Sequence, residues 1–260
     1  MGHALGTKDE IVFLQEKIAR LLDKYQTTLK EIEGRKLGHF KKRPEHGTIY
    51  YIDLDAGNDG DTGLDKDHAW LTLAQFTVVL GKNPGDLAKV RANTDEAMGG
   101  QLSFDEDGDQ DDYIEIRGCS VADDPWGDVS NVKPILTFGD NPVSAVGRDD
   151  DFYKLNRLVI KESGSADGNL QLRDARNWYL LDSEFIENSN AAGKGVYLFG
   201  AKGIIIEGCT FQDNLGYNIY SIRSNAKIKS STFNGGGATT DYGIYGDQAS
   251  FIEAVSCNFG

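Results

Sequence analysis

The stretch Gly208-Cys209-Thr210-Phe211 recurs in related form at three other places in the last hundred residues. Each copy has a small residue, then a polar residue, then phenylalanine, and the other copies are Asp182-Ser183-Glu184-Phe185, Ser230-Ser231-Thr232-Phe233 and Ser256-Cys257-Asn258-Phe259. The phenylalanines are separated by 26, 22 and 26 residues. Self-similarity at a period of roughly 20 to 50 residues marks a fold whose repeats complete one another's core. The chain is therefore expected to form a solenoid.

The residues around each phenylalanine alternate as in a β-strand, where successive side chains point to opposite faces. The four phenylalanines and Ile160 should therefore share the inner face of stacked coils. Two further inner rows are expected, and they are Leu180, Ile206, Ile228, Ala254 and Leu170, Val196, Ile219, Ile244. An outer row is also expected, and it is Gln171, Tyr197, Tyr220, Tyr245. A leucine-rich repeat needs its own leucine pattern and a helical half-repeat, and neither is present.

The pattern resembles that of the right-handed parallel β-helix proteins of the pectin-lyase-like superfamily, over roughly residues 48–260. An upstream segment supports the resemblance, because Tyr50-Tyr51-Ile52-Asp53, Gly57-Asn58-Asp59 and Trp70-Leu71-Thr72-Leu73 look like the strand, loop and capping helix that open many such proteins. The resemblance implies an all-β fold and supplies the handedness, which the spacing alone does not. Proteins of this layout are common among phage tail spikes and polysaccharide-degrading enzymes.

Residues 8–33 contain no glycine or proline and are expected to form an α-helix. Their apolar positions are spaced alternately by 3 and 4, which is typical of a coiled-coil heptad, and they are Ile11, Leu14, Ile18, Leu21, Tyr25, Thr28 and Ile32. Two interpretations remain open: an oligomerising neck, in two or three strands, or a helix that caps its own β-helix. A neck before a β-helix resembles tail-spike organisation, which implies a homotrimer.

The expected organisation has four parts. Residues 1–34 form the N-terminal helix, and residues 35–47 form a basic linker. Residues 48–150 hold the first strand, the capping helix and irregular coils with acidic loops, and residues 151–260 hold the regular coils. The last residues, Phe259 and Gly260, fall partway through a coil, so the sequence predicts a piece of a longer protein.

The formal charge of −14 argues against a nucleic-acid or anionic-membrane partner. The sequence has no run of 18 apolar residues and no signal-peptide pattern, so we expect no membrane insertion. The resemblance to tail spikes and polysaccharide-degrading enzymes implies a location in a virion or outside the cell. Cys209 and Cys257 fall on one inner row two coils apart, which is too far for a disulfide.

Three carboxylates each follow their inner anchor residue by two positions: Glu162, Glu187 and Asp213. On adjacent coils they would stand about 5 Å apart, a separation that suits a retaining glycosidase. They are therefore candidate catalytic residues, and the alternative is a solvated row at a turn. The resemblance also implies sets with an Arg base or a nearby His. These cannot be mapped, since all four His precede the coils: His3, His39, His46 and His68.

The outer tyrosines Tyr197, Tyr220 and Tyr245 are candidate glycan-binding residues, because a row of rings is apolar with polar tips. Subunit contact and a simple stabilising ladder are the alternatives. A calcium site is a candidate in one acidic loop, where carboxylates alternate at Asp105, Asp107, Asp109 and Asp111. That loop has Gln110 where an EF-hand requires glycine.

The leading hypothesis is a phage-type tail spike or fibre that presents a β-helix to a host cell-surface polysaccharide, as part of a depolymerase or beside one. The first alternative is a monomeric polysaccharide lyase or glycosidase. The second is a bacterial surface adhesin without catalysis. Any enzymatic activity would be that of a lyase or glycoside hydrolase.

Overall fold

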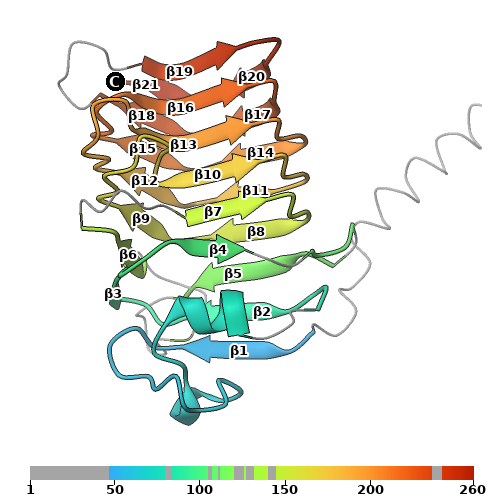
Figure 1. Ribbon diagram of the computed structural model, residues 1–260, viewed down its shortest axis with the longest axis vertical. Coiled ribbons are helices and arrows are strands. Elements are labelled where there is room, and N and C mark those ends of the chain that lie inside the picture. The colour runs from blue at the N-terminus through green and yellow to red at the C-terminus, as the bar shows by residue number, and fades with distance from the viewer. Residues whose placement is uncertain are drawn as a thin grey trace, which may run out of the picture. The chain divides into compact units, whose positions relative to one another are not determined.

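The computed structural model describes residues 47–79, 83–104, 107–110, 112–119, 126, 132–139, 145–235 and 242–260. These residues belong to the unit His46–Gly260. They form a right-handed parallel β-helix, in which each coil of the chain passes through three sheets in turn (Figure 1). The helix expected at residues 8–33 and nearly all of the basic linker lie outside the described residues and stay predictions.

The three sheets, here called A, B and C, are built only from parallel pairs among the described strands. Sheet A runs in the order β1 (Ile49–Ile52), β2 (Leu87–Val90), β5 (Ile114–Gly118), β8 (Tyr153–Asn156), β11 (Tyr179–Leu181), β14 (Ile204–Glu207), β17 (Asn225–Lys229) and β20 (Phe251–Val255). Sheet B runs in the order β3 (Asp95–Ala97), β6 (Ile135–Thr137), β9 (Val159–Lys161), β12 (Glu184–Ile186), β15 (Thr210–Gln212), β18 (Thr232–Asn234) and β21 (Asn258–Phe259). Sheet C runs in the order β4 (Leu102–Phe104), β7 (Ala145–Arg148), β10 (Leu170–Arg173), β13 (Lys194–Phe199), β16 (Tyr217–Ile222) and β19 (Tyr242–Asp247).

The register of the strands confirms the rows expected from the repeat. Phe211 pairs with Phe185 on one side and Phe233 on the other, and Phe233 pairs with Phe259. The ring centroids of Phe211 and Phe233 lie 4.9 Å apart with planes only 4° apart. Ile160 pairs with Phe185, as expected. The repeat therefore builds one continuous aromatic stack inside the coils.

Left-handed backbone conformations recur where one sheet passes to the next. After sheet B, the φ angles of Glu162, Glu187 and Asp213 are 58°, 57° and 54°. Between sheets A and B, Asp182 and Gly208 have φ angles of 45° and 67°. Such angles are uncommon outside Gly, Asn and Asp, because Cβ crowds the backbone. The same sharp turn therefore recurs in successive coils, and the side chains at this turn lie above one another.

In the first coils, aromatic rings pack against one another around β1. The ring of Tyr50 stacks on Trp70 at 5.1 Å, and it contacts Phe76 at 5.5 Å. Phe76 belongs to the short helical segment η2 (Gln75–Val79), which follows the single turn η1 (Lys66–His68). Within the described part of the chain, no helix is both long and apolar enough to cross a membrane.

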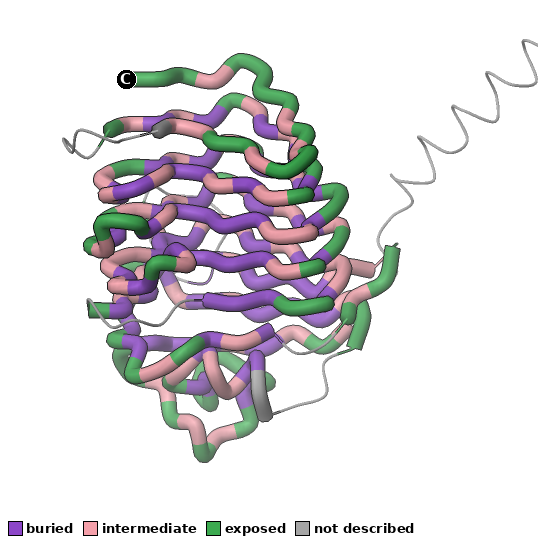
Figure 2. The backbone as a smooth tube through the Cα atoms, turned by 45° about the horizontal axis from the view of Figure 1, so that its top comes forward, coloured by how far each residue is buried: buried purple, intermediate pink, exposed green. Residues whose placement is uncertain are grey.

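Burial follows the stack of coils (Figure 2). The middle coils carry fully buried rings such as Phe185, Phe211 and Trp178, whereas the C-terminal coil is mostly exposed. The side chains that a ligand can contact are those that point outward from the sheets.

Candidate functional site

The tyrosine row lies on the outer face of sheet C, on β13, β16 and β19. Strand register pairs Tyr197 with Tyr220 and Tyr220 with Tyr245. The rings of Tyr220 and Tyr245 stack at 5.1 Å with planes 16° apart, and Tyr217 joins both at 4.9 and 5.4 Å. The sequence thus placed these three tyrosines correctly in one row.

The rings of this row are not equally accessible. Tyr245 is 38% exposed, whereas Tyr197 is only 8% exposed. Lys194 Nζ lies 5.0 Å from the centre of the Tyr197 ring, and the Arg173 guanidinium lies 6.0 Å from it. Burial raises the pKa of Tyr197, although the positive charge of Arg173 opposes the shift. A sugar ring would therefore meet Tyr220 and Tyr245 first.

The candidate catalytic carboxylates occupy one corner, each directly after a strand of sheet B. Glu162 pairs with Lys161 at 2.7 Å, and that contact raises the pKa of the lysine. Asp213 Oδ2 accepts a hydrogen bond from Gln212 Nε2 at 2.8 Å, and Glu187 is exposed. The register of β9, β12 and β15 brings the three residues to matching positions on adjacent coils. Their catalytic role stays a prediction.

The candidate calcium loop is described only in part, since Asp105 and Asp111 lie outside the described residues. Asp107 Oδ1 accepts a hydrogen bond from the backbone of Asp151 at 2.8 Å. The backbone of Asp109 exchanges hydrogen bonds with that of Asp112. Within the described residues, no three His, Cys, Asp or Glu side chains gather to hold a metal ion. Calcium binding stays a prediction.

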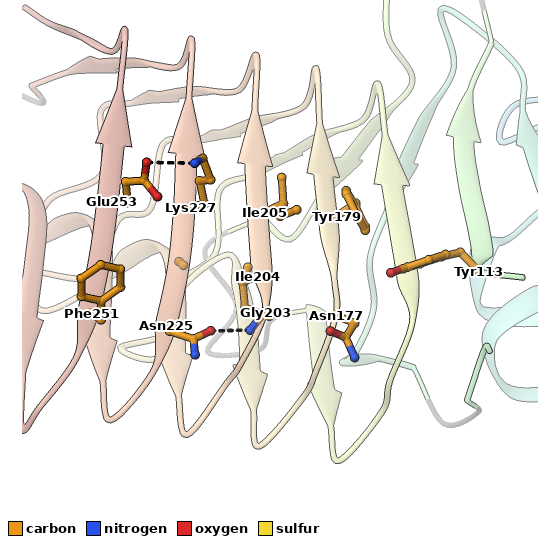
Figure 3. Close-up of a pocket in the computed structure, with 11 residues that line it drawn as sticks. Tyr113, Asn177, Tyr179, Gly203, Ile204, Ile205, Asn225, Lys227, Phe251 and Glu253 are labelled. Carbon is orange, nitrogen blue, oxygen red and sulfur yellow. Dashed lines mark hydrogen bonds and ion pairs between the residues drawn. The ribbon is translucent and has the colours of Figure 1, made fainter. Parts of the chain in front are cut away.

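A groove of about 420 Å³ crosses the outer face of sheet A, and sequence reasoning did not identify it (Figure 3). It runs over β11, β14, β17 and β20. The apolar part of its lining includes Tyr113, Tyr179, Ile204, Ile205, Ala226 and Phe251. The polar part includes Asn177, Asn225, Lys227 and Glu253.

The groove is built from two outward rows of the repeat. Strand register places Tyr179, Ile205, Lys227 and Glu253 side by side in that order. Lys227 Nζ and Glu253 Oε1 form an ion pair of 2.8 Å at one end. The second row includes Asn225, whose Oδ1 accepts a hydrogen bond from the backbone of Gly203.

Tyr113 closes the other end of the groove. Its ring meets Tyr179 edge to face, with centroids 5.1 Å apart and planes at 81°. Burial, and then the neighbouring Tyr179, raise the pKa of Tyr113 well above its usual range. The groove therefore offers a neutral aromatic end and a paired-charge end.

The sequence contained a signal for most of this groove. Tyr179, Ile205, Lys227 and Glu253 are separated by 26, 22 and 26 residues, the same spacing as the phenylalanines. Their side chains differ in kind, so the row does not stand out as the tyrosines do. Tyr113 lies in an irregular coil, and no repeat spacing predicts that it reaches Tyr179.

Comparisons with known proteins agree with this fold. The family described as the right-handed β-helix region matches residues 159–260. No curated protein matches the chain in sequence.

Among solved structures, a lacto-N-biosidase of the GH136 type from Eubacterium ramulus is 13% identical with a TM-score of 0.50, over 86% of this chain and 48% of its own. Pectate lyase Pel9A is 11% identical with a TM-score of 0.54, over 82% of this chain and 63% of its own. The enzymatically active domain of a bacteriophage CBA120 tailspike protein is 13% identical, over 69% of this chain and 33% of its own, with a TM-score of only 0.34.

The chain thus spans about half to two thirds of the length of the first two structures. At these identities the likeness concerns the fold alone. The chain therefore folds as a right-handed parallel β-helix, and its regular region, residues 159–260, matches the family model of the right-handed β-helix region.

Proposed function

We propose that this β-helix binds a cell-surface polysaccharide along the outer face of sheet A. The observation that supports the proposal is the groove itself, which runs across four successive strands (Figure 3). A polysaccharide is a linear ligand of repeating units, and the groove is a linear site built from repeating rows.

The chemistry of the lining suits sugars. Pyranose rings have apolar faces that pack on aromatic rings, and hydroxyl groups that hydrogen-bond to amides and charged groups. Tyr179 and Tyr113 supply the aromatic surface, and Asn177 and Asn225 supply amides along one wall. Aromatic side chains combine large apolar contact with a polar tip and dominate many binding sites.

A binding experiment with two groove variants tests the proposal. Tyr179→Ala removes the central ring, and Tyr179→Phe keeps the ring but removes its hydroxyl. The probes are purified bacterial capsular and O-antigen polysaccharides, and calorimetry gives the affinity. We expect at least a tenfold loss with Tyr179→Ala, a smaller loss with Tyr179→Phe and little change with Thr232→Ala on sheet B. If a polysaccharide binds to Tyr179→Ala and to the unaltered chain with equal affinity, the groove is not its binding site.

A separate experiment tests whether the row of Tyr197, Tyr220 and Tyr245 binds glycans. Tyr220→Ala removes the central ring of that row, where the neighbouring ring Tyr245 is 38% exposed. If polysaccharide affinity and assembly both survive this change, the row is only a stabilising ladder.

The biological setting that we propose is a phage-type tail spike or fibre, which would act at the host surface. A homotrimer joined by the helix of residues 8–33 is part of that proposal. Sedimentation of the full chain should then give three times the chain mass of 28.5 kDa, and a variant that begins near Gly47 should sediment as a monomer. A monomer in both cases would favour the adhesin or the monomeric enzyme.

A catalytic alternative is supported by the fold shared with a lacto-N-biosidase and a pectate lyase. In that case Glu187, Asp213 and Glu162 are the proposed acid and base groups, on adjacent coils. Release of reducing ends or unsaturated sugars from a bound polysaccharide would demonstrate activity. Activity that survives Glu187→Gln, Asp213→Asn and Glu162→Gln would place the reaction elsewhere. If EDTA abolishes the activity and calcium restores it, a calcium site is required.

A further inference from the structure

Three cationic side chains converge on three aromatic rings of sheet C, on a different sheet from the groove. Lys194 Nζ lies 5.0 Å from the Tyr197 ring centre and 5.2 Å from that of Tyr220. Arg173 lies 5.8 Å from the Phe199 ring centre, and Arg223 lies 4.6 Å from it. The chain as a whole carries a charge of −14. A local gathering of positive groups on such a chain therefore needs an explanation.

These three cations have few carboxylate partners. Of these three cations, only Arg173 has an ion-pair partner among the described residues, and that partner is Asp167 at 3.3 Å. Lys194 Nζ donates to the carbonyl oxygen of Ala166. Burial lowers the pKa of Lys194, and the charge of Asp167 offsets this only in part. Cation–π contacts stabilise each group, although they leave its positive charge uncompensated.

Two buried donors on β10 are also unused. Gln171 is only 2% exposed, and its Nε2 has no hydrogen-bond partner among the described residues. The Nε of Arg173 is likewise buried and without a partner in the same part of the chain. The two residues are two positions apart on one strand, so their side chains leave the same face of sheet C. A buried donor without an acceptor is destabilising, so the site lacks an acceptor group.

We propose that this surface, defined by Gln171, Arg173, Lys194, Phe199 and Arg223, binds the anionic substituent of an acidic glycan. Arginine and lysine would hold a carboxylate or a sulfate ester, and the unused donors of Gln171 and Arg173 would find acceptors in its oxygens. The rings of Tyr220 and Tyr245 continue the surface and would carry the neighbouring sugar. The site is independent of the groove on sheet A, where the charged residues Lys227 and Glu253 are paired with each other.

Three polymers with one backbone test this proposal: dextran, carboxymethyl dextran and dextran sulfate of equal length. Binding of the full chain is measured by calorimetry at low and moderate salt. We expect binding of a charged dextran, weakened by salt, and at least tenfold weaker binding of plain dextran. Preference for the carboxymethyl or the sulfated form identifies which anion the site accepts. Equal affinity for the neutral and charged polymers, or binding of neither charged polymer, would overturn the proposal.

Substitutions then locate the site. Arg173→Gln combined with Arg223→Gln removes two charges with little change in shape, and it should weaken the charged dextran at least tenfold. Lys229→Gln is the control, because it removes a partly exposed charge from the outer face of sheet A. Tyr179→Ala in the groove should leave this binding unchanged, so failure of the groove and failure of this site are distinguishable. Unchanged binding by the double variant, with an unchanged melting temperature, would refute the assignment.

Discussion

Asn214 donates a hydrogen bond from its buried side-chain amide to the carbonyl oxygen of Phe185, one coil away, at 2.9 Å. The same amide reaches Asn218 Oδ1 at 2.9 Å, and Asn214 Oδ1 accepts from the backbone of Asn188 at 3.2 Å. Asn214 therefore satisfies backbone groups at the corner after sheet B, where strand pairing is interrupted. The corner depends on one side chain for several hydrogen bonds.

Replacement of Asn214 by alanine should destabilise the protein. The change removes one donor to the Phe185 carbonyl and the acceptor of the buried Asn188 amide, and a buried group left without a partner costs about 1–3 kcal/mol. Urea unfolding followed by circular dichroism measures the loss. Gln212→Ala on the same coil removes an exposed amide and should change stability by no more than about 0.5 kcal/mol. Equal midpoints for the two variants would show that the corner does not need Asn214.

The phenylalanine stack should be equally sensitive. Phe211 is fully buried between Phe185 and Phe233, at centroid distances of 5.4 and 4.9 Å. Phe211→Ala should therefore cost about 3–5 kcal/mol, as for other buried rings. Phe251→Ala is the control, because that ring is 68% exposed. A similar fall in the urea midpoint for both variants would contradict the core that the repeat predicts.

The repeat predicted the inner rows because each one needs the same kind of side chain in every coil. Phe185, Phe211 and Phe233 could be recognised in this way, and so could the outer tyrosines. Repeat spacing does not predict which other side chains surround a residue that points outward. Tyr197 belongs to the predicted row, yet Arg173 and Lys194 lie over its ring and leave it only 8% exposed.

The groove on sheet A is a second case in which repeat spacing does not predict the surroundings of an outward side chain. Its row mixes Tyr179, Ile205, Lys227 and Glu253, so the residues share a position without sharing a chemistry. Tyr113 reaches the groove from an irregular coil, and only the three-dimensional path of the chain shows the contact. The pattern of a sequence thus predicts the stacked core better than the surface that a ligand would meet.

The cysteines should differ sharply in reactivity. Burial raises the pKa of Cys209 to about 12, and its thiol lies 3.3 Å from the carbonyl oxygen of Leu180. Cys119 is also buried, whereas Cys257 is partly exposed. Because the thiolate is the reactive form, DTNB at pH 8 should label Cys257 quickly and the other two only after unfolding. Cys257→Ser should abolish the fast reaction. Fast labelling that persists in this variant would show that Cys119 or Cys209 is open to solvent.

Glu96 on β3 should make stability depend on pH. Its side chain is buried, and Oε2 accepts a hydrogen bond from the backbone of Leu73 at 2.9 Å. Burial raises the pKa of Glu96 from 4.5 to about 7; the Leu73 hydrogen bond opposes the shift and the charge of Asp59 adds to it. The folded protein therefore keeps this proton at pH values where the unfolded chain has lost it. The contribution of the protonated group is complete below about pH 4.5 and is lost as the pH rises through about 7.

Glu96→Gln tests this pH dependence, because glutamine can accept the same hydrogen bond and never ionises. Relative to the variant, the unaltered protein should lose stability progressively between pH 4.5 and about 7, with the largest difference above pH 7. Urea midpoints measured across this range give the comparison. Glu187→Gln, at an exposed corner, controls for the loss of one carboxylate from the surface. If the curves of Glu96→Gln and the unaltered protein run parallel from pH 4.5 to 8, Glu96 is ionised throughout and its burial has no influence on stability.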